Sequence, residues 1–263
     1  MDMELKTLTV NGVTYEVKHP ESGKTYEEGY EEGYTEGKQS EYDRFWDAYQ
    51  QNGNRTDYSN SFAGCGWTQE NFKPKYDIAP ENAYMIFRMN PCEIDLVERL
   101  SSLGVSLDLS KAINTQYMFT NSSFTRIGVI DVSSSINTSP LDSVVANCTK
   151  LVTIDKIIPK VSEYGNEFSK NSFNQCIALE NLTIGGEITK NNFNVQWSTL
   201  LSHDSIVSII NALSTTTSGL TVTVSLTAVN NAFETSQGAA DGSTSEEWLS
   251  LIAARENWTI TLA

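Results

Sequence analysis

Four cysteines and two histidines are the residues of this chain best suited to metal binding or covalent chemistry. The cysteines stand at positions 65, 92, 148 and 176, and none forms the Cys-x-x-Cys pair that is typical of a zinc site. Cys148 and Cys176 instead lie 28 residues apart within similar flanking sequences. We therefore expect both to be small apolar core residues. A disulfide between them is the alternative, which synthesis in the cytoplasm does not favour.

Motifs that usually carry enzymatic chemistry are absent. The sequence contains no phosphate-binding Gly-x-x-x-x-Gly-Lys-[Ser/Thr], no Gly-x-Gly-x-x-Gly and no Gly-x-Ser-x-Gly. His19 lies in a predicted turn and His203 precedes a predicted helix. With these two histidines alone, a histidine-based triad or metal site is not expected. The 33 acidic residues could include the carboxylate pair of a glycan hydrolase, but no pair stands out. We predict no enzymatic activity, no cofactor and no metal.

A repeated pattern surrounds the two cysteines. The segment 145–154 recurs at 173–182 with apolar residues in the same four places, and a shorter copy with serine in place of cysteine occupies 119–127. A fixed period of this size is typical of a solenoid, in which each unit buries its apolar face against its neighbours. We predict a repeat core formed by Phe119, Phe124, Ile127, Val145, Cys148, Leu151, Ile154, Phe173, Cys176, Leu179 and Leu182.

Short strands are expected within these repeats. Leu107–Ser110 and Ile130–Ser133 share the pattern apolar-Asp-apolar-Ser and predict equivalent strands, followed by strands near 154–158 and 182–185. The C-terminal part has a different residue pattern. Apolar residues with helical spacing predict an amphipathic helix over 204–214, and alternation predicts strands at 220–226 and 258–262 with a helix from Ser245 between them. This part is expected to close the end of the repeat core.

The N-terminal part is predicted to attach and to oligomerise. Asn11-Gly12 separates two β-rich runs, which favours a type I′ turn and a β-hairpin. Glycine and tyrosine then recur every fourth residue, a spacing that keeps them on roughly one side of a helix. Each such glycine costs about 1 kcal/mol relative to alanine, which suggests close approach of another backbone. We predict a helix that forms a homotrimer through Tyr26, Gly29, Tyr30, Gly33, Tyr34 and Gly37; a single helix packed on its own domain is the alternative.

Residues 54–95 are rich in aromatic and turn-forming residues and predict an irregular adaptor with few long elements. We expect its aromatic side chains to form the core of this segment, with stacking on sugars as the alternative.

The formal net charge of −15 excludes several classes of partner. An acidic surface repels phosphate backbones and anionic lipid, so we predict no binding to nucleic acid. No run of about 18 apolar residues is present, so no membrane insertion is expected. The N-terminus lacks the basic flank and apolar core of a signal peptide, which predicts synthesis in the cytoplasm.

The cysteine-bearing repeats resemble the BspA-like (treponemal-type) leucine-rich repeats, whose units run roughly as Phe-x-x-Cys-x-x-Leu-x-x-Ile. The resemblance covers about 119–184, with Val145 in place of the aromatic residue and Ser122 in place of cysteine. The Glu-Gly-Tyr repeats, the segment Phe45–Gln50 and the residues from Phe62 to Trp67 look like segments of tail-associated proteins of Firmicutes phages and prophages. The C-terminal helix and closing strand are similar to the ends of those proteins.

Together these features predict an α/β protein with a leucine-rich-repeat-like solenoid. The resemblance implies a phage virion protein, made in the host cytoplasm and released by lysis. It would be a tail fibre, baseplate or other appendage component that contacts other tail proteins through its N-terminal arm and a host cell-surface glycan or protein as receptor. A bacterial BspA-like adhesion protein is the alternative. We predict a β-hairpin attachment arm (1–20), a helical oligomerisation stalk (21–53), an irregular aromatic adaptor (54–95), a leucine-rich-repeat-like region (96–186) and an α/β C-terminal cap (187–263).

Overall fold

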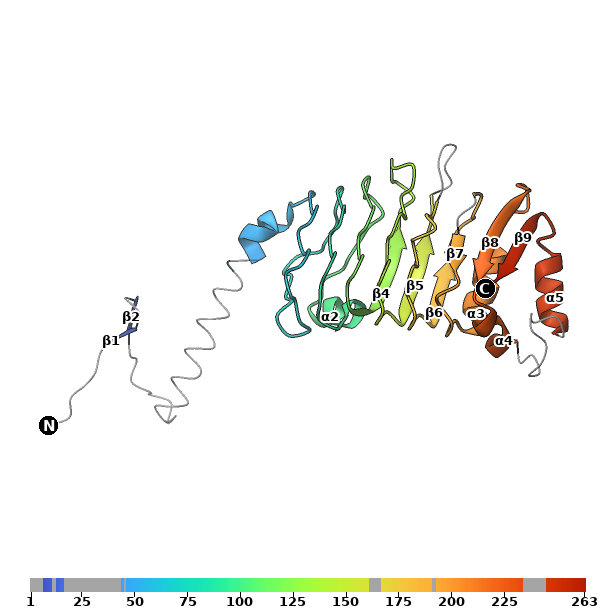
Figure 1. The fold of residues 1–263 in the computed structure, drawn as a ribbon. Coiled ribbons are helices and arrows are strands. Elements are labelled where there is room, and N and C mark those ends of the chain that lie inside the picture. The colour runs from blue at the N-terminus through green and yellow to red at the C-terminus, as the bar shows by residue number, and fades with distance from the viewer. Residues whose placement is uncertain are drawn as a thin grey trace. The chain divides into compact units, whose positions relative to one another are not determined.

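The described part of the chain forms an α/β structure with two parallel β-sheets, as the computed structural model in Figure 1 shows. The chain divides into two compact units, Met1–Ala48 and Tyr49–Ala263. The structure describes residues 7–10, 13–16, 44, 46–160, 167–190, 193–233 and 245–263.

The described residues of the first unit include a two-stranded antiparallel pair. Strand β1 (Thr7–Val10) pairs with β2 (Val13–Glu16), and Val10 lies opposite Val13. The Asn11-Gly12 turn expected between them lies outside the described residues. The same holds for the residues predicted to oligomerise: Tyr26, Gly29, Tyr30, Gly33, Tyr34 and Gly37.

A four-stranded parallel sheet runs through the second unit in chain order. Its strands are β3 (Ile94–Asp95), β4 (Phe124–Asp131), β5 (Thr153–Ile158) and β6 (Asn181–Ile184). Ile127 pairs with Ile154, and Ile154 pairs with Leu182. All three side chains are buried, so one apolar position from each strand contributes to a continuous core. Figure 1 shows β4, β5 and β6 side by side.

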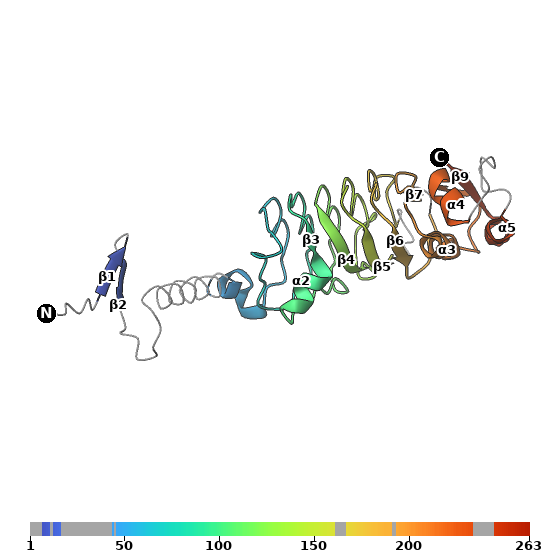
Figure 2. The ribbon, with the colours of Figure 1, turned by 90° about the horizontal axis from the view of Figure 1, so that it is seen from below.

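The segments that connect these strands are paired with one another as well. We call the successive windings formed by the described residues of 56–202 the stacked turns; Figure 2 shows them from a second side. Backbone N–H groups of one turn donate to carbonyl groups of the next, as in Phe119 to Val144 (2.9 Å) and Asn121 to Ala146 (2.8 Å). The same pairing occurs upstream, where the Phe62 N–H donates to the Ile86 carbonyl at 2.8 Å.

Left-handed backbone recurs at fixed places in the stacked turns. Tyr117 and Asn121 have φ values of 58° and 59°, and Ser143 and Asn147 in the next turn have 49° and 60°. Such values are uncommon outside glycine. Here they accompany an alternating pattern of hydrogen bonds. Every second backbone N–H donates to a carbonyl of the next turn. The N–H groups between them donate within their own turn, as the Ser122 N–H does to the Phe119 carbonyl. The backbone is therefore satisfied without long strands or helices.

Several aromatic residues of 54–95 lie inside the stacked turns. Phe62 stacks on Phe87 with ring centroids 5.0 Å apart, and Phe87 stacks on Phe119 at 5.4 Å. These rings and that of Phe72 are buried. This segment lacks long elements, as expected, but its inter-turn hydrogen bonds and aromatic stack continue directly into the repeats. Because these four rings are buried, they are not available to stack on sugars.

A three-stranded parallel sheet forms the C-terminal part of this unit. It consists of β7 (Phe193–Val195), β8 (Leu220–Val224) and β9 (Trp258–Leu262). Helix α3 (His203–Ala212) connects β7 to β8, and the chain from β8 to β9 contains α4 (Leu226–Ala232) and α5 (Glu246–Ala253). The serines before the three helices accept hydrogen bonds from backbone N–H groups of their first turns and so fix where each begins: Ser202, Ser225 and Ser245.

Three of the expected strands differ in the structure. Of Ile130–Ser133, only Ile130 and Asp131 lie in a strand, at the end of β4. Leu107–Ser110 does not form a strand. Of its four residues, Leu107 alone makes a bridge, an isolated parallel one with Ile78. The Asp108 carboxylate accepts the Ser110 N–H at 2.9 Å, and this local turn bends the chain away from a ladder. The strand expected to extend to Leu226 ends at Val224 instead, since Ser225 caps helix α4 there.

Replacing Leu179 with alanine tests the enclosed core. Leu179 is 0% exposed, whereas Leu200 is 51% exposed. We expect Leu179→Ala to lower the free energy of unfolding by about 2–5 kcal/mol, since it removes buried methyl groups and leaves a cavity. Leu200→Ala should change it by less than about 0.5 kcal/mol. Urea unfolding followed by circular dichroism measures both, and equal losses would contradict the enclosure of Leu179.

Candidate binding surfaces on the stacked turns

The residues predicted to form the repeat core are all buried. None is more than 2% exposed. The set comprises Phe119, Phe124, Ile127, Val145, Cys148, Leu151, Ile154, Phe173, Cys176, Leu179 and Leu182. Their role is to hold successive turns together, so a binding site must be sought on the outer face of the same turns.

The two buried cysteines use their thiols as hydrogen-bond donors. Cys148 Sγ donates to the Phe119 carbonyl at 3.0 Å, and Cys176 Sγ donates to the Val145 carbonyl at 3.1 Å. Ser122 lies 3.4 Å from the Cys148 sulfur and takes the equivalent place in the preceding turn. All four cysteines are free thiols. Burial raises the pKa of Cys148 to about 11 and also raises the pKa of Cys176, so neither is a ready nucleophile.

Thiol labelling at pH 8 tests this arrangement. In the native protein we expect Cys65, which is exposed, to react quickly with a disulfide reagent, and Cys148 and Cys176 to react only on unfolding. The two buried thiols should be slow because they are both inaccessible and protonated. Mass spectrometry of the labelled peptides identifies each site. Labelling of Cys148 at the rate of Cys65 would show that the turns are open.

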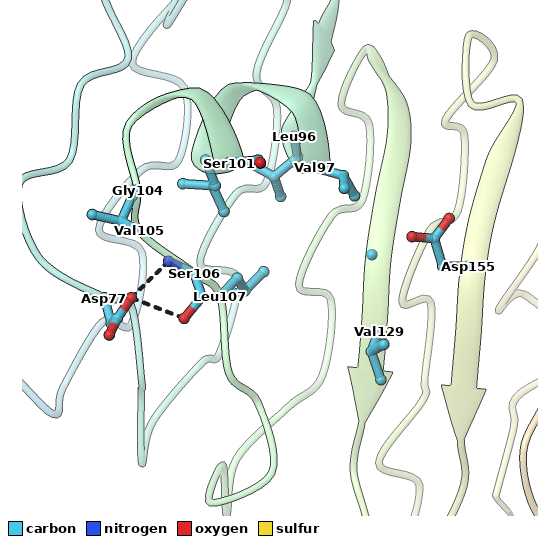
Figure 3. A pocket seen from close by; sticks show the side chains of 12 residues that line it. Asp77, Leu96, Val97, Ser101, Gly104, Val105, Ser106, Leu107, Val129 and Asp155 are labelled. Carbon is cyan, nitrogen blue, oxygen red and sulfur yellow. Dashed lines mark hydrogen bonds between the residues drawn. The ribbon is translucent and has the colours of Figure 1, made fainter.

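A groove lies between helix α2 (Leu96–Ser102) and the parallel sheet, with a volume of about 580 Å³. Apolar side chains line it, and Figure 3 shows Val97 on the helix side and Val129 on strand β4. Two carboxylates lie at its margins. Asp77 accepts hydrogen bonds from the Ser106 N–H (2.7 Å) and the Ser106 hydroxyl (2.9 Å).

The second carboxylate, Asp155, is paired with Arg126 on the neighbouring strand. The two side chains form a bidentate ion pair with N–O distances of 2.9 and 3.0 Å. Both carboxylates of the groove are therefore engaged in structural hydrogen bonds. An apolar floor with satisfied polar margins suits binding of another surface better than proton transfer.

Helix α2 was not predicted from the sequence, although a signal for it exists. The Asp95 side chain caps the helix by accepting the Glu98 N–H at 2.9 Å, and Asp-x-x-Glu is a variant of the capping box. Gly128 lets the helix approach the sheet, because a Cβ at that position would lie 3.3 Å from Val97 Cγ2. The missing side chain at Gly128 thus leaves room for both the helix and the groove.

A row of side-chain amides crosses the exposed ends of three successive turns. The Asn147 amide donates to the Asn121 amide oxygen at 2.9 Å, and the Asn174 amide donates to the Asn147 oxygen at 3.4 Å. We call Asn121, Asn147 and Asn174 the amide ladder. The ladder was not predicted, because the side-chain direction depends on the left-handed backbone at Asn121 and Asn147.

Exposed apolar side chains follow the amide ladder along the chain. Ile177 is 47% exposed, Trp197 is 41% exposed and Leu200 is 51% exposed. Ser198, next to Trp197, donates its hydroxyl hydrogen bond to the Cys176 carbonyl at 3.1 Å, which links this turn to the one that carries Ile177. We call Ile177, Trp197 and Leu200 the apolar end.

His203 links two helices of the C-terminal part. Its Nδ1 lies 3.2 Å from Asp204 and its Nε2 lies 2.8 Å from Glu247, in the first turn of α5. Hydrogen bonds to Asp204 and to Glu247 raise the pKa of His203. The contact therefore ties α3 to α5 most strongly when the imidazole is protonated. His19, the other histidine, lies outside the described residues.

This contact predicts a pH-dependent contribution to stability. Because the pKa of His203 is higher in the folded state than its ordinary 6.5, the stabilisation is fully present below pH 6.5 and is lost as the pH rises through the raised pKa. Glu247→Gln should therefore lower the thermal midpoint more at pH 5.5 than at pH 9. The loss should stay below about 1 kcal/mol, since the pair is partly exposed.

Glu246→Gln is the matched control for that experiment. Glu246 occupies the same first helical turn as Glu247 and is also exposed, so both substitutions remove the same favourable interaction with the helix dipole. Of these two glutamates, Glu247 is the one that contacts His203. Equal pH dependence of the two variants would assign the effect to the helix terminus.

Within the described residues, no group of three His, Cys, Asp or Glu side chains is placed to hold a metal ion. No helix in that same part of the chain is long and apolar enough to span a bilayer.

Fold and surface together define an α/β protein whose outer face presents side-chain amides, the Arg126–Asp155 ion pair and apolar side chains on stacked turns. Comparisons with protein-family models, with curated proteins and with solved structures give no match to this chain. The functional argument therefore depends on the surfaces described above.

Proposed function

We propose that this chain is a structural protein of a phage virion, a tail fibre, baseplate or other appendage component that binds the host cell surface. The observation that carries the proposal is the repetition of exposed side chains on turns that are hydrogen-bonded to their neighbours, as in the amide ladder. Side chains held on a rigid backbone lose little further entropy when they bind. The segments that resemble tail-associated proteins supply the setting.

The proposed architecture is a leucine-rich-repeat-like solenoid with an α/β cap. Three features support it: the parallel pairing of Ile127, Ile154 and Leu182, the equivalent places of Ser122 and Cys148, and the inter-turn hydrogen bonds of the connecting segments. The sheet of β7, β8 and β9 would close the apolar core at the C-terminal end, as the last unit of a repeat array must.

We further propose that the N-terminal part attaches the protein to the particle. A two-stranded hairpin such as β1–β2 is marginally stable alone, and its edges can accept a strand from another protein. The Gly and Tyr spacing from Tyr26 to Gly37 supports a homotrimer through the 21–53 stalk. Three copies at one attachment point would convert weak contacts into avidity.

Immunogold labelling and adsorption competition test this function. Antibody against the purified full chain should label the tail region of phage particles released by a strain that carries the gene. The full chain, added to cells in excess, should slow the adsorption of those particles. Label confined to the bacterial envelope would favour the BspA-like adhesion protein instead. Label on the tail without competition would remove the receptor-binding role and leave an architectural one.

A further inference from the structure

We propose that the amide ladder and the apolar end together form a binding site for a neutral polysaccharide. This inference rests on the proposed function, because it names the chemical class of the host receptor.

The amide ladder offers donors and acceptors in the balance that sugar hydroxyls require. A side-chain amide has two N–H donors and two acceptor lone pairs. Asn147 uses one donor toward Asn121 and accepts one hydrogen bond from Asn174, so half of its capacity is left for a ligand. Each sugar hydroxyl can donate and accept at the same time. Because Asn121 and Asn147 are exposed, these remaining groups face solvent.

The regular spacing of the ladder favours a polymer over a single sugar. Neighbouring turns linked by parallel backbone hydrogen bonds lie about 4.8 Å apart, so equivalent amides recur at that short interval. A chain that repeats its hydroxyl groups can engage several amides in succession. The hydrogen bonds between the amides also hold them in one orientation before the ligand arrives, which lowers the entropy lost on binding.

The apolar end supplies the second contact that sugars need. The C–H face of a pyranose ring is apolar and packs on the face of an aromatic ring, and Trp197 presents an indole that is 41% exposed. Leu200 follows Trp197 by three residues, and Ile177 lies in the turn to which Ser198 is hydrogen-bonded; both are exposed and add apolar area. Asn174 and Ile177 lie in one turn, and the hydrogen bond from Ser198 to the Cys176 carbonyl joins that turn to the one that carries Trp197. Hydroxyl recognition and ring stacking would therefore occur on consecutive turns.

The absence of charged residues from the amide ladder and the apolar end favours a neutral polysaccharide. The amide ladder and the apolar end consist only of asparagine, isoleucine, tryptophan and leucine, so no member can pair with an ionic group. Lys150 follows Asn147 closely in the chain, but its ammonium is 3.3 Å from Glu93. The net charge of −15 further disfavours an anionic polymer.

The test uses the purified full chain and an array of immobilised polysaccharides. The array holds neutral polymers of hexoses and N-acetylhexosamines, with anionic uronate polymers for comparison. We expect binding to at least one neutral polymer and none to the anionic ones. For that polymer, Trp197→Ala and Asn147→Ala should each weaken binding about tenfold, which corresponds to the loss of one good contact. Trp197→Phe, which keeps an aromatic face, should retain most of the affinity.

Two exposed residues on other elements serve as matched controls. Asn181 on β6 is an exposed amide that also contacts the neighbouring strand, through Thr153 at 3.3 Å, and Leu249 on α5 is 43% exposed. Asn181→Ala and Leu249→Ala should bind the polymer as the unchanged chain does. Urea unfolding of every variant checks that the fold is kept.

The outcomes separate this inference from the proposed function. Binding of a neutral polymer that Trp197→Ala and Asn147→Ala leave unchanged would place the site elsewhere and overturn the inference. A chain that binds none of the neutral polymers but still slows phage adsorption would overturn the receptor class and leave the proposed function standing. Failure in both assays would overturn both.

Discussion

Hydrogen bonds between the backbones of successive turns are the constraint on which the rest of this structure depends. Most of the chain between residues 56 and 202 lies in turns and short strands, and a buried turn must satisfy its N–H and C=O groups. Here every second N–H does so through the next turn, as at Phe119 and Asn121. Because the pairing is parallel and aligns Ile127 with Ile154 and Ile154 with Leu182, buried positions of one turn lie beside buried positions of its neighbour.

That alignment explains why equivalent buried positions of successive turns carry similar residues. Ser122, Cys148 and Cys176 are all buried, and Cys148 and Cys176 each donate to a carbonyl of the preceding turn. A buried donor of this size needs an acceptor, and the preceding turn supplies it. Serine and cysteine are therefore interchangeable in this column as small side chains with a donor, which accounts for the serine in the shortest repeat.

The sequence allowed the apolar column and the C-terminal elements to be predicted, because both depend on local periodicity. Helix α3 over His203–Ala212 follows from the spacing of Ile206, Ile209 and Ile210. Left-handed backbone at Tyr117 or Ser143 could not be predicted in the same way, since no local signal distinguishes these residues from ordinary turn residues. The sequence also did not show that the turns continue upstream through Phe62. The pairing of that segment depends on hydrogen bonds between residues far apart in the sequence, which leave no local pattern.

The outer face is built on the same hydrogen-bonded turns as the core, but neighbouring turns do not enclose its side chains. In the segments 121–123 and 147–149, the middle residue is buried, and the residues on either side of it are exposed or half-buried. The hydrogen bonds between turns at these positions use backbone groups, so a substitution that tolerates the local backbone conformation should keep them. A fixed scaffold can therefore carry asparagine in three turns and tryptophan in a following one, and the spacing between these groups stays that of the backbone. Such an arrangement allows the chemistry of a binding surface to change one turn at a time without loss of the fold.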